Sequence, residues 1–245
     1  STGGYNTGVG GECMENVTTG GENTSMGAFA LRFITDSSNN TAMGYKALYT
    51  QTGGSSNTGI GHQAGEFVND ARYTTLVGAQ CGSLITNNDY NTMMGYYTGR
   101  NTTTGENNAF FGAIAGRFNS TGSRNTYIGC QAVDNQTHTG SDNTVIGFAA
   151  AQNIISGYDN ILIGKSVASG LTTANANIGI GIDALNACTS SAGNVAIGYA
   201  SMGAGVMSGT GRNIALGDAS MYNVTNGQNN IAIGWNAGRS GFQTP

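Results

Sequence analysis

Charged side chains, proline and long apolar runs are all scarce in this 245-residue chain. Only 9% of the residues are charged, one residue is proline, and the formal net charge is -4. A soluble domain usually has about 25% charged residues, so this composition is unusual for one. A disordered chain is poor in regularly placed apolar residues, so the chain does not fit that class either. No segment is basic, and no stretch approaches the roughly 18 apolar residues of a membrane-spanning helix. We therefore expect no nucleic-acid partner and no membrane insertion of this segment.

Glycine is abundant, with 41 copies, and it recurs at a fixed spacing. It does not occupy every third position, which excludes collagen. One glycine, which we call the anchor glycine, returns at every seventeenth position, apart from one step of eighteen and one of nineteen. The pattern predicts a single repeat array over residues 1–245, without caps, and we expect the natural protein to continue beyond it. The fourteen anchors are Gly10, Gly27, Gly44, Gly61, Gly78, Gly95, Gly112, Gly129, Gly147, Gly164, Gly181, Gly198, Gly217 and Gly234.

The four residues before each anchor repeat their chemistry from copy to copy. The first is Asn in thirteen of the fourteen copies, with Thr74 as the exception. The second is Thr in most early copies and Ile or Val in later ones, and the fourth is always apolar. Because residues two apart share a face of a strand, we expect a strand before each anchor with the second and fourth residues in the core.

The third of these four residues, in the middle of each expected strand, is mostly small or apolar. A strand that is apolar on both faces is usually buried on both faces. We expect one face to line the coil's own interior and the other to contact sister chains in a symmetric oligomer. The middle residues predicted at this oligomer interface are Leu76, Met93, Phe110, Tyr127, Val145 and Leu162.

Seventeen residues are too few for a helical-repeat pair or a propeller blade, which need about 33 to 50. They suit one coil of a β-solenoid, in which successive strands stack in parallel about 4.8 Å apart. The predicted fold is therefore all-β, a β-solenoid of fourteen 17-residue coils. The recurring Asn is expected to form a ladder of stacked amides along the solenoid.

Three stretches of the chain resemble known repeats: "NVAIGYAS", "NTAMGYKAL" and "NIAIGWNAG". They are similar to the head repeats of YadA-like trimeric autotransporter adhesins. They are also similar to the "NTAIGYxAL" arrays of phage tail fibres and related bacterial surface fibres that end in a self-cleaving chaperone domain. The resemblance covers the whole chain, and it implies a left-handed parallel β-roll assembled as a parallel homotrimer.

Catalytic and cofactor motifs are weak in this sequence. "IGKS" at residues 163–166 is similar to the end of a phosphate-binding loop, but Asp159 stands where that loop needs a glycine. His62 and His138 are about 4.5 coils apart, too far to share a metal ion. No paired carboxylates and no nucleophile with a base recur. We expect no enzyme activity, no cofactor and no catalytic, cofactor-binding or metal-binding residues.

Residues that vary between copies are the candidates for ligand binding. Aromatic side chains and histidine fill the two positions after several anchors, and arginine fills the fifth position in successive copies. Aromatic residues with arginine are typical interface anchors, and aromatic rings also stack on sugars. The alternative is that they only cover the edge of a thin coil and keep it soluble. The candidates are Tyr45, His62, Tyr96, Tyr97, Arg100, Arg117, Tyr199 and Trp235.

The leading functional hypothesis is a structural and adhesive trimeric fibre segment, head or shaft, of a phage tail fibre or bacterial adhesin. Its location would be extracellular, on a cell surface or virion, and its partners a host-surface glycan or protein receptor. A second hypothesis is an ice-binding solenoid, suggested by the Thr positions and low charge. The change from Thr to Ile after residue 160, and the expected core position of these residues, argue against it. A glycan-degrading tailspike is a third hypothesis, opposed by the lack of paired acids.

Overall fold

The computed structural model describes residues 3–134, 137–205, 211–225 and 227–239. The chain divides into two compact units, residues 1–124 and 125–245. The described residues contain no helix and fourteen strands of three residues, one before each anchor glycine. The strands of the first unit are β1 (Thr7–Val9), β2 (Thr24–Met26), β3 (Thr41–Met43), β4 (Thr58–Ile60), β5 (Thr75–Val77), β6 (Thr92–Met94) and β7 (Ala109–Phe111). Those of the second unit are β8 (Thr126–Ile128), β9 (Thr144–Ile146), β10 (Ile161–Ile163), β11 (Ile178–Ile180), β12 (Val195–Ile197), β13 (Ile214–Leu216) and β14 (Ile231–Ile233).

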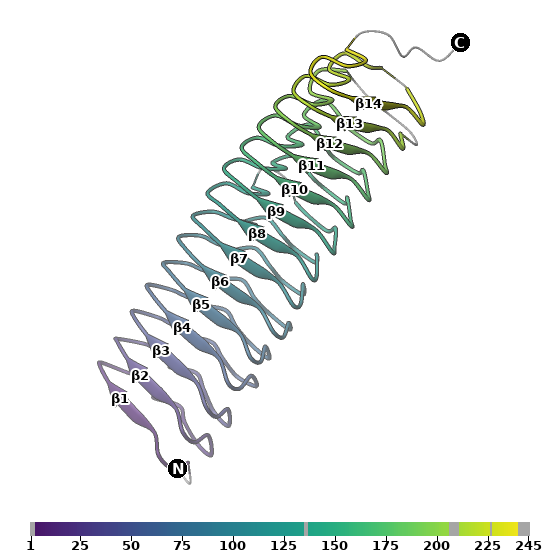
Figure 1. The fold of residues 1–245 in the computed structure, drawn as a ribbon. Coiled ribbons are helices and arrows are strands. Elements are labelled where there is room, and N and C mark those ends of the chain that lie inside the picture. Colours follow the sequence, from purple (N-terminus) through teal and green to yellow (C-terminus); the bar gives the residue numbers. More distant parts are fainter. Residues whose placement is uncertain (1–2, 135–136, 206–210, 226, 240–245) are drawn as a thin grey trace. The chain divides into compact units, whose positions relative to one another are not determined.

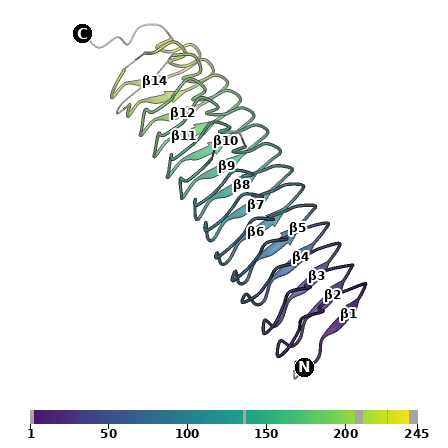
Figure 2. The same ribbon diagram turned by 180° about the vertical axis from the view of Figure 1, so that it is seen from behind.

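Within each unit the strands pair in parallel in the order of the sequence, as Figure 1 shows. The register brings the same repeat position of successive coils side by side, for example Thr7 beside Thr24 and Ile161 beside Ile178. Seen from behind in Figure 2, irregular segments return the chain from the end of one strand to the start of the next. The predicted all-β solenoid, with one coil for each step of the repeat, is thus confirmed.

The middle residue of each strand points into the coil's own interior, which corrects the predicted trimer interface. We call this position the middle column. All six residues proposed for the interface belong to it, and the single chain buries them completely. A side chain that is already buried within its own coil has no surface to offer to a sister chain. The six residues to which this correction applies are Leu76, Met93, Phe110, Tyr127, Val145 and Leu162.

The first and last residues of each strand, which we call the outer columns, point away from the interior and not into the core as predicted. Ten of their large apolar side chains are between 36% and 69% exposed in the single chain. Side chains alternate across a strand, so an error of one position in the assignment reverses both faces. The exposed apolar residues are Val9, Met26, Met43, Met94, Ile128, Ile161, Ile197, Ile214, Ile231 and Ile233.

The interior keeps its volume by pairing the middle column with the position four residues after the anchor, which we call the compensating column. In most coils with a small middle residue the compensating residue is large, as in Ala42 with Leu48. In the coils of β5–β7 the middle residue is large and the compensating residue is glycine. A Cβ added at Gly99, for example, would lie 2.2 Å from Sδ of Met93. Close packing therefore links two positions six residues apart.

The Asn ladder predicted from the sequence is confirmed within each unit. In the first unit, Asn23 donates from Nδ2 to Oδ1 of Asn6 (3.0 Å) and to the carbonyl of Ser37 (2.9 Å). The same Asn6 oxygen accepts the backbone N–H of Asn23 at 2.9 Å. Each Asn of the ladder thereby gives hydrogen-bond partners to buried polar groups, which would lower the stability of the fold if they had none. At Thr74 only the backbone N–H reaches the preceding rung, Asn57, at 3.0 Å.

Each anchor glycine ends its strand in a backbone conformation that other residues rarely adopt. The anchor φ angles lie between 120° and 145°, a region that is almost restricted to glycine. The coils also approach closely here: a Cβ on Gly44 would lie 2.5 Å from the carbonyl oxygen of Gly61. Conformation and close approach together explain why this position never varies.

Candidate binding surfaces

In each unit the outer columns form a surface without charge. Their 28 positions contain only Thr, Ala, Val, Ile, Leu, Met and Phe. In β1–β6 the first column consists of six threonines, whereas in β10–β14 both columns are aliphatic. We call this surface the outer sheet face.

A second surface lies on the segments that follow the anchors, where Tyr45 stacks on His62. Their ring centroids are 5.4 Å apart with an interplanar angle of 20°. The Nζ atom of Lys46 lies 5.7 Å from the Tyr45 ring centroid and 5.0 Å from that of Tyr49. Cations are attracted to ring faces at such distances. Tyr45 and His62, both predicted as site residues, are therefore brought together.

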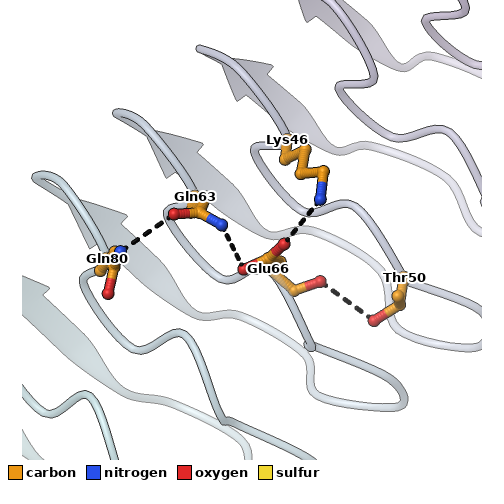
Figure 3. Close-up of polar contacts among 5 residues, drawn as sticks. All are labelled: Lys46, Thr50, Gln63, Glu66 and Gln80. Atoms are coloured by element: carbon orange, nitrogen blue, oxygen red, sulfur yellow. Dashed lines mark hydrogen bonds and ion pairs between the residues drawn. The ribbon is translucent and has the colours of Figure 1, made fainter.

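A buried carboxylate joins the Lys46 region across coils, as Figure 3 shows. Glu66 accepts hydrogen bonds from Nζ of Lys46 at 3.3 Å and from Nε2 of Gln63 at 2.8 Å. Gln80 in turn donates to Oε1 of Gln63 at 3.0 Å. The Lys46 charge is consequently neutralised within the chain. The sequence reasoning missed Glu66, although it stands in the same repeat position as Arg100.

Arg32, in an earlier coil of the same surface, is neutralised in the same way. Its guanidinium pairs with Glu12 at 2.7 Å and with Glu15 at 2.8 Å. It also lies 5.3 Å from the ring centroids of both Phe29 and Phe33. The coils of this surface up to residue 67 therefore carry paired charges among aromatic rings.

Tyr96, Tyr97 and Arg100 form a further cluster on the same surface. The two tyrosine rings meet edge to face with centroids 4.1 Å apart, and the Arg100 guanidinium lies 5.0 Å from the Tyr97 centroid. A hydrogen bond with Tyr97 is the main cause of the raised pKa of Tyr96. Arg117 stands in the same position of the next coil, with its guanidinium 4.4 Å from the Phe118 centroid. The structure thus groups these predicted site residues.

Tyr199 and Trp235 belong to the second unit. Both occupy the position directly after an anchor, and their exposed fractions are 57% and 79%. The backbone N–H of Tyr199 donates to Oδ1 of Asp218 at 3.0 Å. The sequence reasoning also missed Tyr73 and Tyr90, which stack with centroids 5.1 Å apart; their recurrence five residues before an anchor was the available signal.

The second unit contains a buried histidine, His138. His138 is fully buried, and burial lowers its pKa to about 4. Its ring meets that of Tyr127 with centroids 5.7 Å apart. Among the described residues, no three His, Cys, Asp or Glu side chains are close enough together to hold a metal ion.

Comparison with known proteins adds no further assignment. No family model matches the chain, and neither a curated protein nor a solved structure matches it. No helix within the described ranges is long and apolar enough to cross a membrane. The functional argument therefore depends on the two surfaces themselves.

Proposed function

We propose that this chain is a segment of a trimeric adhesive fibre, of the kind found in phage tail fibres or bacterial surface adhesins. The observation that carries this proposal is the outer sheet face, which exposes large apolar side chains and has no charge. Exposed apolar sheet surfaces on a soluble protein usually mark an interface. A face without charge does not repel its own copy, so a second and third copy of this chain are suitable occupants.

We infer three chains from the resemblance of the repeats to trimeric fibres, and we infer the interface from the exposed outer columns. Under this proposal three copies pack through the outer sheet face and cover its Thr and aliphatic side chains. The aromatic and cationic surface after the anchors then remains available to a receptor on a host cell. Such a segment works outside the cell, on a virion or on a bacterial surface.

Sedimentation of the full chain tests the assembly. We expect a mass three times the 24.9 kDa of one chain. Ile197→Asp places a charge on the outer sheet face and should dissociate the assembly into folded monomers. The matched control is Ile155→Asp, because the two isoleucines are 38% and 39% exposed but Ile155 lies outside the outer columns. A wild-type monomer would contradict the proposal, and so would equal dissociation by both variants.

Ice binding is a second candidate because the Thr column faces outward, contrary to the sequence-based expectation. Thr7, Thr24, Thr41, Thr58, Thr75 and Thr92 stand side by side on β1–β6. An ice-binding protein must keep this array free, whereas a trimer covers it. Thermal hysteresis in dilute solution of a monomeric chain would support ice binding, and its absence together with a trimeric mass would exclude it.

A further inference from the structure

The surface formed by the segments after the anchors is not uniform in charge. In the coils up to residue 67, Arg32 pairs with Glu12 and Glu15, and Lys46 pairs with Glu66. The next three such segments, residues 79–84, 96–101 and 113–118, contain two arginines and no acidic residue. These three segments therefore contain positive side chains but no acidic residues.

Arg100 is the cation whose environment is best defined. In the part of the chain that the structure describes, no carboxylate lies within ion-pair distance of it, unlike Arg32 and Lys46. Its Nε is buried and makes no hydrogen bond. The guanidinium is instead held 5.0 Å from the centroid of the Tyr97 ring. A cation fixed by a ring and lacking an acidic partner is prepared to bind an anion from outside.

Tyr96 provides an aromatic surface beside this cation. Its side chain is 55% exposed, and the edge-to-face contact with Tyr97 restricts its orientation. A ring that is already held in place loses little conformational entropy when a ligand binds. The pair thus offers one apolar ring and one positive charge close together.

We propose that Tyr96, Tyr97 and Arg100 form a binding site for an acidic saccharide. Arg100 pairs with a carboxylate or sulfate group of the ligand, and the Tyr96 ring packs against the face of a sugar ring. This inference rests on the proposed adhesive function and specifies its receptor class.

The sparse charge of this site favours a saccharide over a nucleic acid. Nucleic-acid binding usually involves about 6 to 10 phosphate contacts made by many cations, and this chain has nine Lys and Arg residues in total with a net charge of -4. An acidic peptide would use Arg100 but has no need of the exposed Tyr96 ring. A ligand that alternates sugar rings with single anionic groups uses both features.

Isothermal titration of the full chain tests this site with three probes: oligogalacturonate for carboxylates, a heparin oligosaccharide for sulfates, and maltooligosaccharide as a neutral sugar. We expect at least one anionic probe to bind about tenfold or more tightly than the neutral one. Arg100→Gln and Tyr96→Ala should each weaken that binding about tenfold or more. The matched control, Lys46→Gln, removes a cation that Glu66 already neutralises and should leave the affinity unchanged.

Several outcomes would overturn the proposal. These are the absence of binding by both anionic probes, equal binding of the neutral sugar, equal binding of oligoglutamate or single-stranded DNA, and equal losses in the Arg100 and Lys46 variants. Binding of only one anionic probe supports the site and identifies the anionic group. Sedimentation of the same sample separates the two proposals, since a trimer that binds no saccharide refutes this site but leaves the fibre assembly intact.

Discussion

The pairing of Met93 with Gly99 allows the packing of the interior to be tested directly. Met93 belongs to the middle column, and a Cβ added at Gly99 would lie 2.2 Å from its Sδ atom and 2.8 Å from its Cε atom. Another coil of the same unit has the opposite pair, Ala42 and Leu48, both buried. The double variant Met93→Ala/Gly99→Leu therefore gives one coil the middle and compensating residues of the other.

The two single substitutions should each destabilise the chain, and their combination should restore much of the loss. Removing a buried Met side chain costs about 2–5 kcal/mol. Adding Leu beside an intact Met93 forces overpacking, at about 1–3 kcal/mol or more. In the double variant the Leu fills the space left by Met93. What remains is the cost of a left-handed backbone, about 1–2 kcal/mol, and a close contact with Phe110, because a Cβ at position 99 would lie 3.2 Å from its Cδ2 atom. Leu48 already adopts this conformation, with a φ of 47°.

Urea unfolding of the full chain, followed by circular dichroism, measures the coupling free energy between the two positions. We expect a favourable coupling of about 2 kcal/mol or more. The matched control is Met94→Ala with Gly99→Leu, because Met94 has the same side chain but is 46% exposed on the outer sheet face. Additive effects at positions 93 and 99, or equal coupling at position 94, would refute the assignment of the middle column to the interior.

Two further predictions concern single sites. Thr74→Asn completes the Asn ladder and should raise the free energy of unfolding by about 1 kcal/mol, the net value of one added hydrogen bond, whereas no gain in urea unfolding would mean that the gap costs nothing. His138 has a pKa lowered to about 4 by burial, so the unfolded chain takes up a proton below the ordinary value of about 6.5 while the folded chain does not. Stability should therefore be independent of this group above about pH 6.5, fall by up to about 3 kcal/mol as the pH drops to 4, and level off below. His138→Leu should remove this part of the pH dependence, and an unchanged profile would contradict it.

The period, the strand positions and the Asn ladder could be predicted from the sequence because they repeat in register. Anchor glycines at a nearly constant spacing locate each strand, as β11 and β14 show. Which strand residues face the interior of the coil could not be inferred in the same way. In β10–β14 no strand residue is polar, so alternation alone leaves two solutions. The Thr that begins most earlier strands was assigned to the core because it shares a face with the apolar last residue.

A signal that resolves this ambiguity was nevertheless present in the sequence. Leu76 is followed six residues later by Gly82, whereas Gly179 is followed by Leu185. Opposite size changes at two positions indicate that both side chains occupy the same closed volume. The contacts agree, since a Cβ at Gly82 would lie 2.6 Å from Cδ2 of Leu76 and one at Gly179 would lie 2.9 Å from Cδ1 of Leu185. The grouping of Tyr96 with Arg100 was inferred from their shared coil, but the neutralisation of Lys46 by Glu66 depends on side-chain orientation.

Variation between repeats therefore has two physical causes, and only one of them points to function. Several residues of the middle column change size together with the compensating column, and the large Met93 stands opposite the small Gly99. Tyr96 and Arg100 lie on the outside, where no close packing requires a compensating change. If their identities served only to keep the solenoid soluble, any polar residue would suffice, and an arginine without an acidic partner would have no advantage over one paired as Arg32 is. The absence of that pairing is what makes Arg100 the first position to substitute when binding is measured.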